Sequence, residues 1–337
     1  MRRSVLFLVV AAACVLGLGA GWMLRDLHAV DRADVDLAVW RQQMERDGMR
    51  VNALIARHVP AGIAAQLDIS YDSNDPEALL DVYYPADAGV QGRKLPTVVW
   101  IHGGGWIPGS KNHISNYLRL LASHGFTVVG VNYPLAPHRP YPAALRQLNA
   151  ALAFLKNSPP AGPVDAGRLF LAGDSAGAQL ATQLAGIVSE PSDAQAVGIV
   201  PGIARQDLRG VLLFCGVYDI DLAFQDLNRR RFARLMRAYF SGSDYPAPPT
   251  ARQFSVLRTI TQNYPPLFVT VGNEDVLAGQ ARRLVEAAQR NKVPVESLLF
   301  AADYKPALGH EYQWDLDLKE ARLALDRSVA FMQGALR

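Results

Sequence analysis

Short apolar runs alternate with segments of helical periodicity from Pro60 to the end of the chain, and this alternation constrains the fold most strongly. Strands that alternate with helices form a mostly parallel sheet with helices on both faces. About 300 residues follow the N-terminal segment, which suits one large α/β domain. The expected strands are 79–84, 96–101, 126–132, 168–172, 210–215, 266–271 and 295–300, and the expected helices are 112–123, 142–156, 176–188, 279–291 and 316–332.

Two glycine-rich turns each follow one of these apolar runs. The first is His102–Trp106, which contains three consecutive glycines. The second is Gly173–Gly177, a Gly-x-Ser-x-Gly sequence between an expected strand and an expected helix. A Gly-x-Ser-x-Gly sequence alone is weak evidence, because glycine and serine are common residues. Both turns, in this order and each after a strand, strongly indicate a site for acyl transfer.

Within these turns, Ser175 is the candidate nucleophile. It is expected at the carboxyl end of its strand, where open α/β sheets place their ligands, and a serine hydroxyl needs a base to become nucleophilic. The backbone N–H groups of Gly104, Gly105 and Ala176 are the candidate oxyanion-hole donors, because glycine permits the required close approach and unusual φ. Two supporting residues are predicted, His102 to brace the glycine loop and Trp106 to line the site or pack in the core.

The base and the acid are sought after Ser175, in the chain order serine, acid, histidine. Only His310 follows Ser175 among the seven histidines, in a loop between the last expected strand and the last expected helix. The alternative for His310 is an ordinary surface loop position. Asp275 lies just past the strand 266–271, as a residue that orients the base must. Asp303 and Asp219, which also follow strands, remain alternatives for the acid.

The chain resembles the α/β-hydrolases of the hormone-sensitive-lipase-like group, which includes bacterial carboxylesterases and arylacetamide deacetylase-type enzymes. The resemblance is carried by 102–106, 173–177, 272–275 and 309–310, and it covers roughly residues 65–335. It implies an α/β-hydrolase fold with an eight-stranded sheet and a small helical cap. It also implies hydrolysis of carboxylic esters with short or medium acyl chains by a Ser175, Asp275 and His310 triad.

Three functions remain open at this point. The leading hypothesis is a serine carboxylesterase that works through an acyl-enzyme. An amidase, arylformamidase or deacetylase would use the same site on a different bond. An inactive membrane-tethered binding protein would keep the fold without the activity. No metal-ligand spacing, dinucleotide fingerprint or P-loop is present, so we expect no metal and no cofactor. A net charge of +3 gives no indication of a nucleic acid partner.

The N-terminus contains an uncharged run of 21 residues, Ser4–Leu24, after Arg2 and Arg3. This run is long enough to span a bilayer as one helix, so we expect an uncleaved anchor with the catalytic domain outside the cytoplasm, in the periplasm if the source is bacterial. A cleaved signal peptide, with secretion, is the first alternative. A lipoprotein signal, indicated by the sequence Ala11–Cys14, is the second alternative.

The expected organisation is an anchor or signal over 1–25, an amphipathic helical stalk or lid over 26–64, and a catalytic domain over 65–337. Cap elements are expected around 189–209 and 222–262. The second of these contains an arginine series at helical spacing, for which a solvated helix face is the simplest interpretation and a contact with lipid headgroups or an anionic substrate is the alternative. The arginine series is Arg229, Arg230, Arg231, Arg234 and Arg237.

The chain has two cysteines, Cys14 and Cys215. They are too far apart in the expected architecture to form a disulfide.

Overall fold

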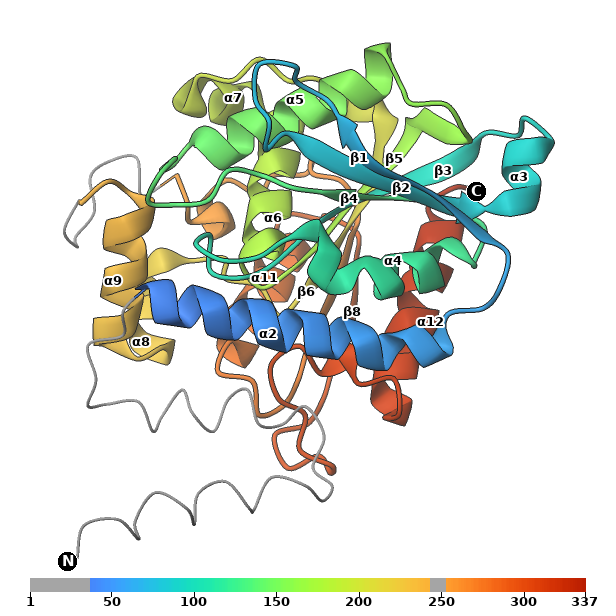
Figure 1. The fold of residues 1–337 in the computed structure, drawn as a ribbon. Helices are drawn as coiled ribbons and strands as arrows, with labels where there is room; N and C mark the ends of the chain where they lie inside the picture. The colour runs from blue at the N-terminus through green and yellow to red at the C-terminus, as the bar shows by residue number, and fades with distance from the viewer. Residues whose placement is uncertain (1–36, 243–252) are drawn as a thin grey trace, which may run out of the picture.

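The computed structural model describes residues 37–242 and 253–337. These residues form one α/β unit around an eight-stranded sheet (Figure 1). The strands are β1 (Ile63–Ser70), β2 (Leu79–Pro85), β3 (Leu95–Ile101), β4 (Thr127–Val131), β5 (Val164–Asp174), β6 (Leu208–Phe214), β7 (Leu267–Val271) and β8 (Val295–Leu299). The helices are α2 (Leu37–Ile55), α3 (Ala86–Val90), α4 (Ser115–Ala122), α5 (Ala143–Asn157), α6 (Ala176–Ser189), α7 (Pro191–Val197), α8 (Ile220–Asp226), α9 (Arg229–Tyr239), α11 (Ala278–Arg290) and α12 (Lys319–Gly334).

The sheet has the order β1-β2-β4-β3-β5-β6-β7-β8. Strand β2 pairs antiparallel with both β1 and β4, and every pair from β4 to β8 is parallel. The mostly parallel sheet is therefore confirmed, with eight strands. All seven strands expected from the apolar runs are present, and β1 is an additional antiparallel strand at the edge of the sheet.

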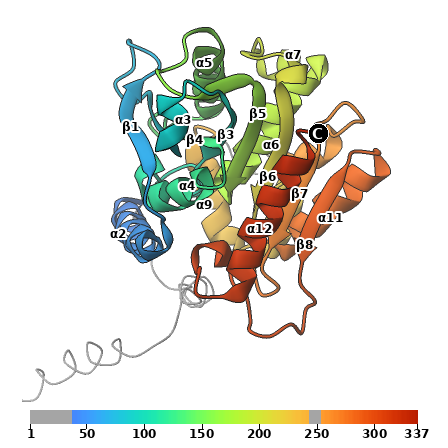
Figure 2. The same cartoon turned by 90° about the vertical axis from the view of Figure 1, so that its right-hand side faces the viewer.

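Side chains on both faces of the central strands are buried, as a covered parallel sheet requires. On one face a chain of ring contacts runs across the sheet from Trp100 through Phe214 and Phe268 to Phe331 of α12, and Tyr117 of α4 joins it at Trp100. On the other face α6, buried along its whole length, packs against β3, β5 and β6. Figure 2 shows the strands passing between these helical layers.

Helix α2 lies along the outside of the domain and is fixed to it by polar contacts (Figure 1). Asn52 donates to Ser115 and accepts from the backbone N–H of Asn116, and His113 lies 2.7 Å from Glu45. Arg41 donates to the carbonyl of Ala136 at 2.6 Å. Helix α2 lies within the segment 26–64, for which an amphipathic stalk or lid is expected, and it packs against the segment that includes α4.

The expected N-terminal anchor, Cys14 and part of the 222–262 cap lie outside the described residues. Among the helices that are described, none is both long and apolar enough to cross a membrane. The segment 189–209, expected as a cap element, contains α7, which packs on α6. In the described part of 222–262, α8 and α9 form two short helices beside the N-terminal end of α2 (Figure 1).

Candidate active site

Ser175 lies on a tight turn between β5 and α6. Its φ of 51° is in the left-handed region, which is strained for a residue with a side chain. A Cβ atom on Gly177 would lie 2.0 Å from the carbonyl oxygen of Ile101, and one on Gly173 would lie 2.5 Å from the carbonyl carbon of Gly177. Gly177 is therefore needed for the close approach of this turn to β3, and Gly173 for the close approach of the end of β5 to the start of α6. The turn holds the serine at the carboxyl edge of the sheet.

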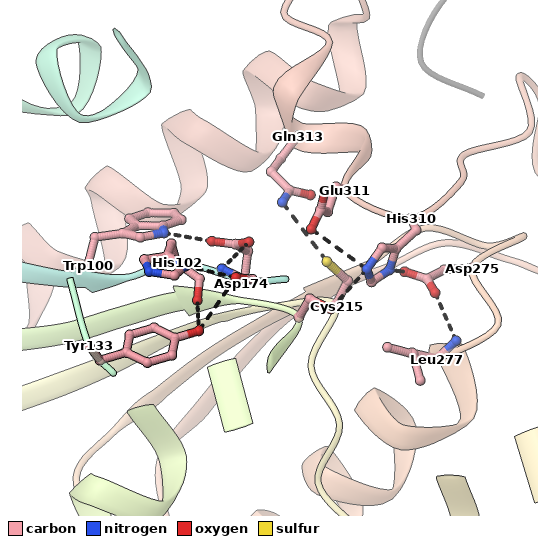
Figure 3. A network of polar contacts seen from close by, with 12 residues as sticks. Trp100, His102, Tyr133, Asp174, Cys215, Asp275, Leu277, His310, Glu311 and Gln313 are labelled. Carbon is pink, nitrogen blue, oxygen red and sulfur yellow. Dashed lines mark hydrogen bonds and ion pairs between the residues drawn. The ribbon is translucent and has the colours of Figure 1, made fainter. Parts of the chain in front are cut away.

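Three loops at that edge bring Ser175, His310 and Asp275 into one hydrogen-bonded chain. The Nε2 atom of His310 lies 3.0 Å from Oγ of Ser175, and its Nδ1 atom lies 2.9 Å from Oδ2 of Asp275. The second oxygen of Asp275 accepts the backbone N–H of Leu277 at 2.8 Å, which fixes the carboxylate (Figure 3). Because the carboxylate can only accept, Nδ1 of the neutral histidine carries the proton and Nε2 is free to accept from the serine.

The surroundings of His310 act on its pKa in opposite directions. Burial favours the neutral ring and lowers the pKa, whereas the Asp275 carboxylate favours the imidazolium and raises it. The net effect raises the pKa of His310 well above its ordinary value. A second carboxylate is near, since Oε1 of Glu311 lies 3.7 Å from Nε2. The site is thus arranged to stabilise positive charge on the imidazole.

The other acids considered for this position lie elsewhere. Asp219 caps the N-terminus of α8 by accepting the backbone N–H of Leu222 at 2.9 Å. Asp303 is exposed on the loop after β8 and is not among the described partners of His310. Of the three aspartates weighed from the sequence, the structure brings only Asp275 to the histidine.

The glycine loop after β3 presents backbone donors to the same place. Gly104 and Gly105 have φ values of 108° and 59°, which glycine adopts without strain. Within the described parts of the chain, the N–H groups of Gly104, Gly105 and Ala176 have no hydrogen-bond acceptor. All three residues line one cavity together with Ser175 and His310. These unsatisfied donors can receive an oxygen that develops negative charge.

His102 and Tyr133 brace this loop from below. Nδ1 of His102 lies 2.8 Å from the carbonyl oxygen of Gly103, and the imidazole stacks on the Tyr133 ring at 4.3 Å. The Tyr133 hydroxyl donates to the His102 carbonyl at 2.9 Å (Figure 3). Burial lowers the pKa of His102 to about 3, so its ring is neutral and donates to the Gly103 carbonyl.

Asp174 links the two motifs, a role that was not predicted from the sequence. Its carboxylate accepts the backbone N–H of Gly103 and the indole N–H of Trp100, each at 2.8 Å (Figure 3). Burial, followed by the charge of Glu311, raises the pKa of Asp174 to about 8. The only signal available was its position directly before the candidate nucleophile, in a motif whose fixed positions are the serine and the two glycines.

The cavity above Ser175 has a volume of about 170 Å³ and mostly apolar walls. Trp106 forms one wall and is held by a 3.1 Å hydrogen bond to Gln179 and by stacking on Tyr239. Helix α2 contributes Trp40 and Met44, which sequence analysis did not assign to the site. The remaining lining residues are Val217, Asp226, Leu227, Asn228, Arg231, Phe232, Leu235, Val276, Leu277 and Glu311.

One group of side chains in the described chain has the composition of a metal site. Ligand atoms of Cys215, Asp275 and His310 all lie within 4.8 Å of one another. Asp275 and His310 are already hydrogen-bonded to each other, and burial raises the pKa of the Cys215 thiol to about 11. A thiol that stays protonated is a poor metal ligand, so the group is better described as part of the hydrogen-bonded site. Cys215 itself is a free cysteine.

Comparison with known proteins places the chain among hydrolases. The family described as "alpha/beta hydrolase fold" matches residues 98–304. An acetyl-hydrolase from Streptomyces hygroscopicus is 32% identical over 248 residues, which cover 71% of this chain and 76% of that protein. An acetyl esterase from Salmonella paratyphi B is 28% identical over 214 residues, covering 60% of this chain and 62% of the esterase.

Solved structures agree with this grouping. Esterase B from Lactobacillus rhamnosis, in a structure inhibited by a tributyrin phosphonate, superposes with a TM-score of 0.74 at 26% identity, covering 89% of this chain and 94% of the esterase. A hyperthermophilic esterase from Pyrobaculum calidifontis shares the fold with a TM-score of 0.71 at 21% identity, covering 94% of this chain and 98% of the other. This chain therefore belongs to the alpha/beta hydrolase fold family.

Proposed function

We propose that this protein is a serine hydrolase that cleaves carboxylic esters through an acyl-enzyme. The observation that carries the proposal is the chain of hydrogen bonds from Ser175 through His310 to Asp275. Ser175 and His310 line a cavity that can receive a substrate. The relatives' names support the same chemistry, since they include an acetyl-hydrolase and an acetyl esterase. No cofactor is needed for this reaction.

In the proposed mechanism, Oγ of Ser175 attacks the ester carbonyl while Nε2 of His310 takes its proton. Asp275 holds the imidazole in the correct tautomer and stabilises the imidazolium. The carbonyl oxygen, now an oxyanion, accepts hydrogen bonds from the N–H groups of Gly104, Gly105 and Ala176. The imidazolium then protonates the leaving alcohol. In the second half of the reaction, His310 takes a proton from water as the water attacks the acyl-enzyme, and it returns that proton to Oγ of Ser175 as the acid leaves.

The proposed substrates carry short to medium acyl chains. The cavity has a volume of about 170 Å³, and Trp40, Trp106 and Phe232 contribute bulky side chains to its mostly apolar wall. We infer that these side chains limit the length of the acyl chain that the cavity accepts. Each methylene that is buried on apolar walls adds about 0.8 kcal/mol of binding free energy until the space is filled.

The test is hydrolysis of p-nitrophenyl esters from acetate to palmitate, with Ser175→Ala as the control. We expect a maximum at short or medium chains and no turnover by the variant above the uncatalysed rate. Labelling by a fluorophosphonate probe reports on the nucleophile without any choice of substrate. Labelling without ester turnover would favour an amidase or deacetylase, which an anilide with the same acyl group would reveal. A folded protein that shows neither labelling nor turnover would refute the proposal.

We also propose that the uncharged run Ser4–Leu24 holds the protein at a membrane, with the catalytic domain on the extracytoplasmic side. Fractionation of cells that express the full chain or residues 26–337 tests this. The full chain should sediment with membranes and resist extraction by high salt, and the shorter chain should not. Recovery of the full chain in the secreted fraction, with a shortened N-terminus, would instead show a cleaved signal.

A further inference from the structure

One arginine of the series on α9 lies inside the cavity. Arg231 lines the same cavity as Ser175 and His310, whereas Arg229 and Arg230 beside it are exposed. Its guanidinium lies over the Trp40 ring, with Cζ 5.5 Å from the ring centroid. The planar guanidinium is therefore held against one wall by an aromatic face, and its N–H groups are left for another partner.

No acidic side chain in the described chain lies within ion-pair distance of Arg231. The two carboxylates that line the cavity have other surroundings. Glu311 lies 3.7 Å from Nε2 of His310, at the catalytic end. Asp226 lies beside Gly279, and its buried Oδ2 atom has no hydrogen-bond partner among the described residues, Arg231 included. Arg231 is thus a cation inside a substrate cavity without an acidic partner from the described residues.

A half-buried guanidinium without a counterion is costly, because burial removes part of its hydration. Burial indeed lowers the pKa of Arg231, yet an arginine stays charged at neutral pH. A planar guanidinium matches a carboxylate with two parallel hydrogen bonds. A carboxylate delivered by the substrate would supply the missing partner at this wall.

We propose that Arg231 binds a carboxylate on the substrate, so that the enzyme prefers esters that carry one free carboxylate over neutral esters of the same length. This inference rests on the proposed function and deepens it by naming a substrate class. The carboxylate belongs either to the acyl part, as in a half-ester of a dicarboxylic acid, or to the alcohol part, as in an O-acylated hydroxy acid. In both cases the reacting carbonyl lies at Ser175 and the carboxylate lies at Arg231.

The test compares kcat/KM for charged and neutral partners of equal length. Monomethyl adipate against methyl heptanoate examines the acyl part, and 4-acetoxybutanoate against pentyl acetate examines the alcohol part. Arg231→Met removes the charge but keeps an unbranched side chain against Trp40, and Arg230→Met on the exposed face of the same helix is the matched control. We expect the charged-to-neutral ratio to fall about 10- to 100-fold in Arg231→Met, as for loss of a charge-assisted hydrogen bond. The ratio should stay within about 2-fold in Arg230→Met.

Arg231→Lys separates charge from shape, since it keeps the cation but loses the planar fork; it should retain part of the preference. Calorimetric binding of monomethyl adipate to Ser175→Ala, with and without Arg231→Met, gives a readout that needs no turnover. Equal losses for charged and neutral esters in Arg231→Met would show that Arg231 only packs on Trp40, and would overturn the inference. If turnover depends on Ser175 but shows no preference for charged esters, this inference is wrong and the proposed function still holds. If Ser175 is unreactive, the proposed function itself is wrong.

Discussion

The Trp40 indole of α2 lies directly against Gly105 of the glycine loop. A Cβ atom on Gly105 would be 3.0 Å from Cη2 of Trp40, closer than nine in ten real Cβ contacts. The N-terminal helix therefore forms a wall of the cavity at the candidate oxyanion hole. This contact joins the candidate oxyanion hole to a segment that precedes the first strand of the sheet.

Trp40→Ala should move the acyl preference toward longer chains. Removing the indole enlarges the cavity beside Gly105, so esters longer than the wild-type optimum gain room. The kcat/KM ratio of p-nitrophenyl octanoate to butyrate should rise at least several-fold, with a loss of stability of about 1–3 kcal/mol because Trp40 is only partly buried. Val39→Ala, an exposed position on the same helix, should leave the ratio unchanged. An unchanged ratio in Trp40→Ala would exclude this wall as a determinant of chain length.

Asp174→Asn should impair both activity and stability. The two carboxyl oxygens each accept from one N–H donor, and an amide would face one of these donors with its own NH₂ group. Leaving a buried donor unpaired costs about 1–3 kcal/mol, and release of Gly103 should lower kcat at least 10-fold by misplacing Gly104 and Gly105. Urea unfolding and ester kinetics measure the two effects. The control is Asp87→Asn, which removes an exposed ion pair with Arg93 and should change stability by less than about 0.5 kcal/mol.

The pH dependence should follow the protonation of His310. The imidazole must be neutral to act as a base, and the Asp275 carboxylate raises its pKa against the effect of burial. The acid limb of the kcat/KM profile should therefore lie above the ordinary histidine value of 6.5. Asp275→Asn removes the charge that stabilises the imidazolium, so the limb should move to lower pH while kcat falls by about 10⁴-fold. Asp303→Asn, an exposed acid, should shift neither; a limb unmoved by Asp275→Asn would contradict the assignment.

Lys111→Met should destabilise the fold without touching the cavity. Lys111 is 2% exposed, and its ammonium lies 2.7 Å from carboxylate oxygens of both Asp81 and Asp68. Asp81 is 1% exposed, so loss of the cation leaves a buried charge and should cost about 3–5 kcal/mol. Urea unfolding measures this loss, with the exposed Lys94→Met as control. A loss below 1 kcal/mol would mean that water replaces the ammonium.

Most of the fold could be predicted because buried parallel strands are continuous apolar runs. Strands β3, β4 and β7 have almost entirely buried side chains, and their limits agree with the expected ones to within one or two residues. The missed strand, β1, has no fully buried residue and contains Gln66 and Asp68. An edge strand of this kind has neither a continuous apolar run nor a clear alternation, so its sequence pattern is weak.

The candidate site could be predicted only where a motif defines a position. Ser175 and the glycines are part of local turns, and His310 is the only histidine after the serine. By contrast, Trp40 and Arg231 reach the cavity from two separate helices, and no local pattern shows which face of a helix meets a distant loop. Their approach depends on tertiary packing, which the periodicity of a single helix does not encode.

The residues that line the cavity and the residues proposed to react come from different parts of the chain, and this separation has a consequence. The proposed reacting groups belong to loops at the ends of β3, β5, β7 and β8, whereas Trp40 and Met44 belong to α2 and Arg231 to α9. Substitutions in these two helices can change which molecules enter without altering the strained turn or the hydrogen-bonded triad. The choice of substrate can thus change through the two outer helices while the proposed reacting groups keep their positions.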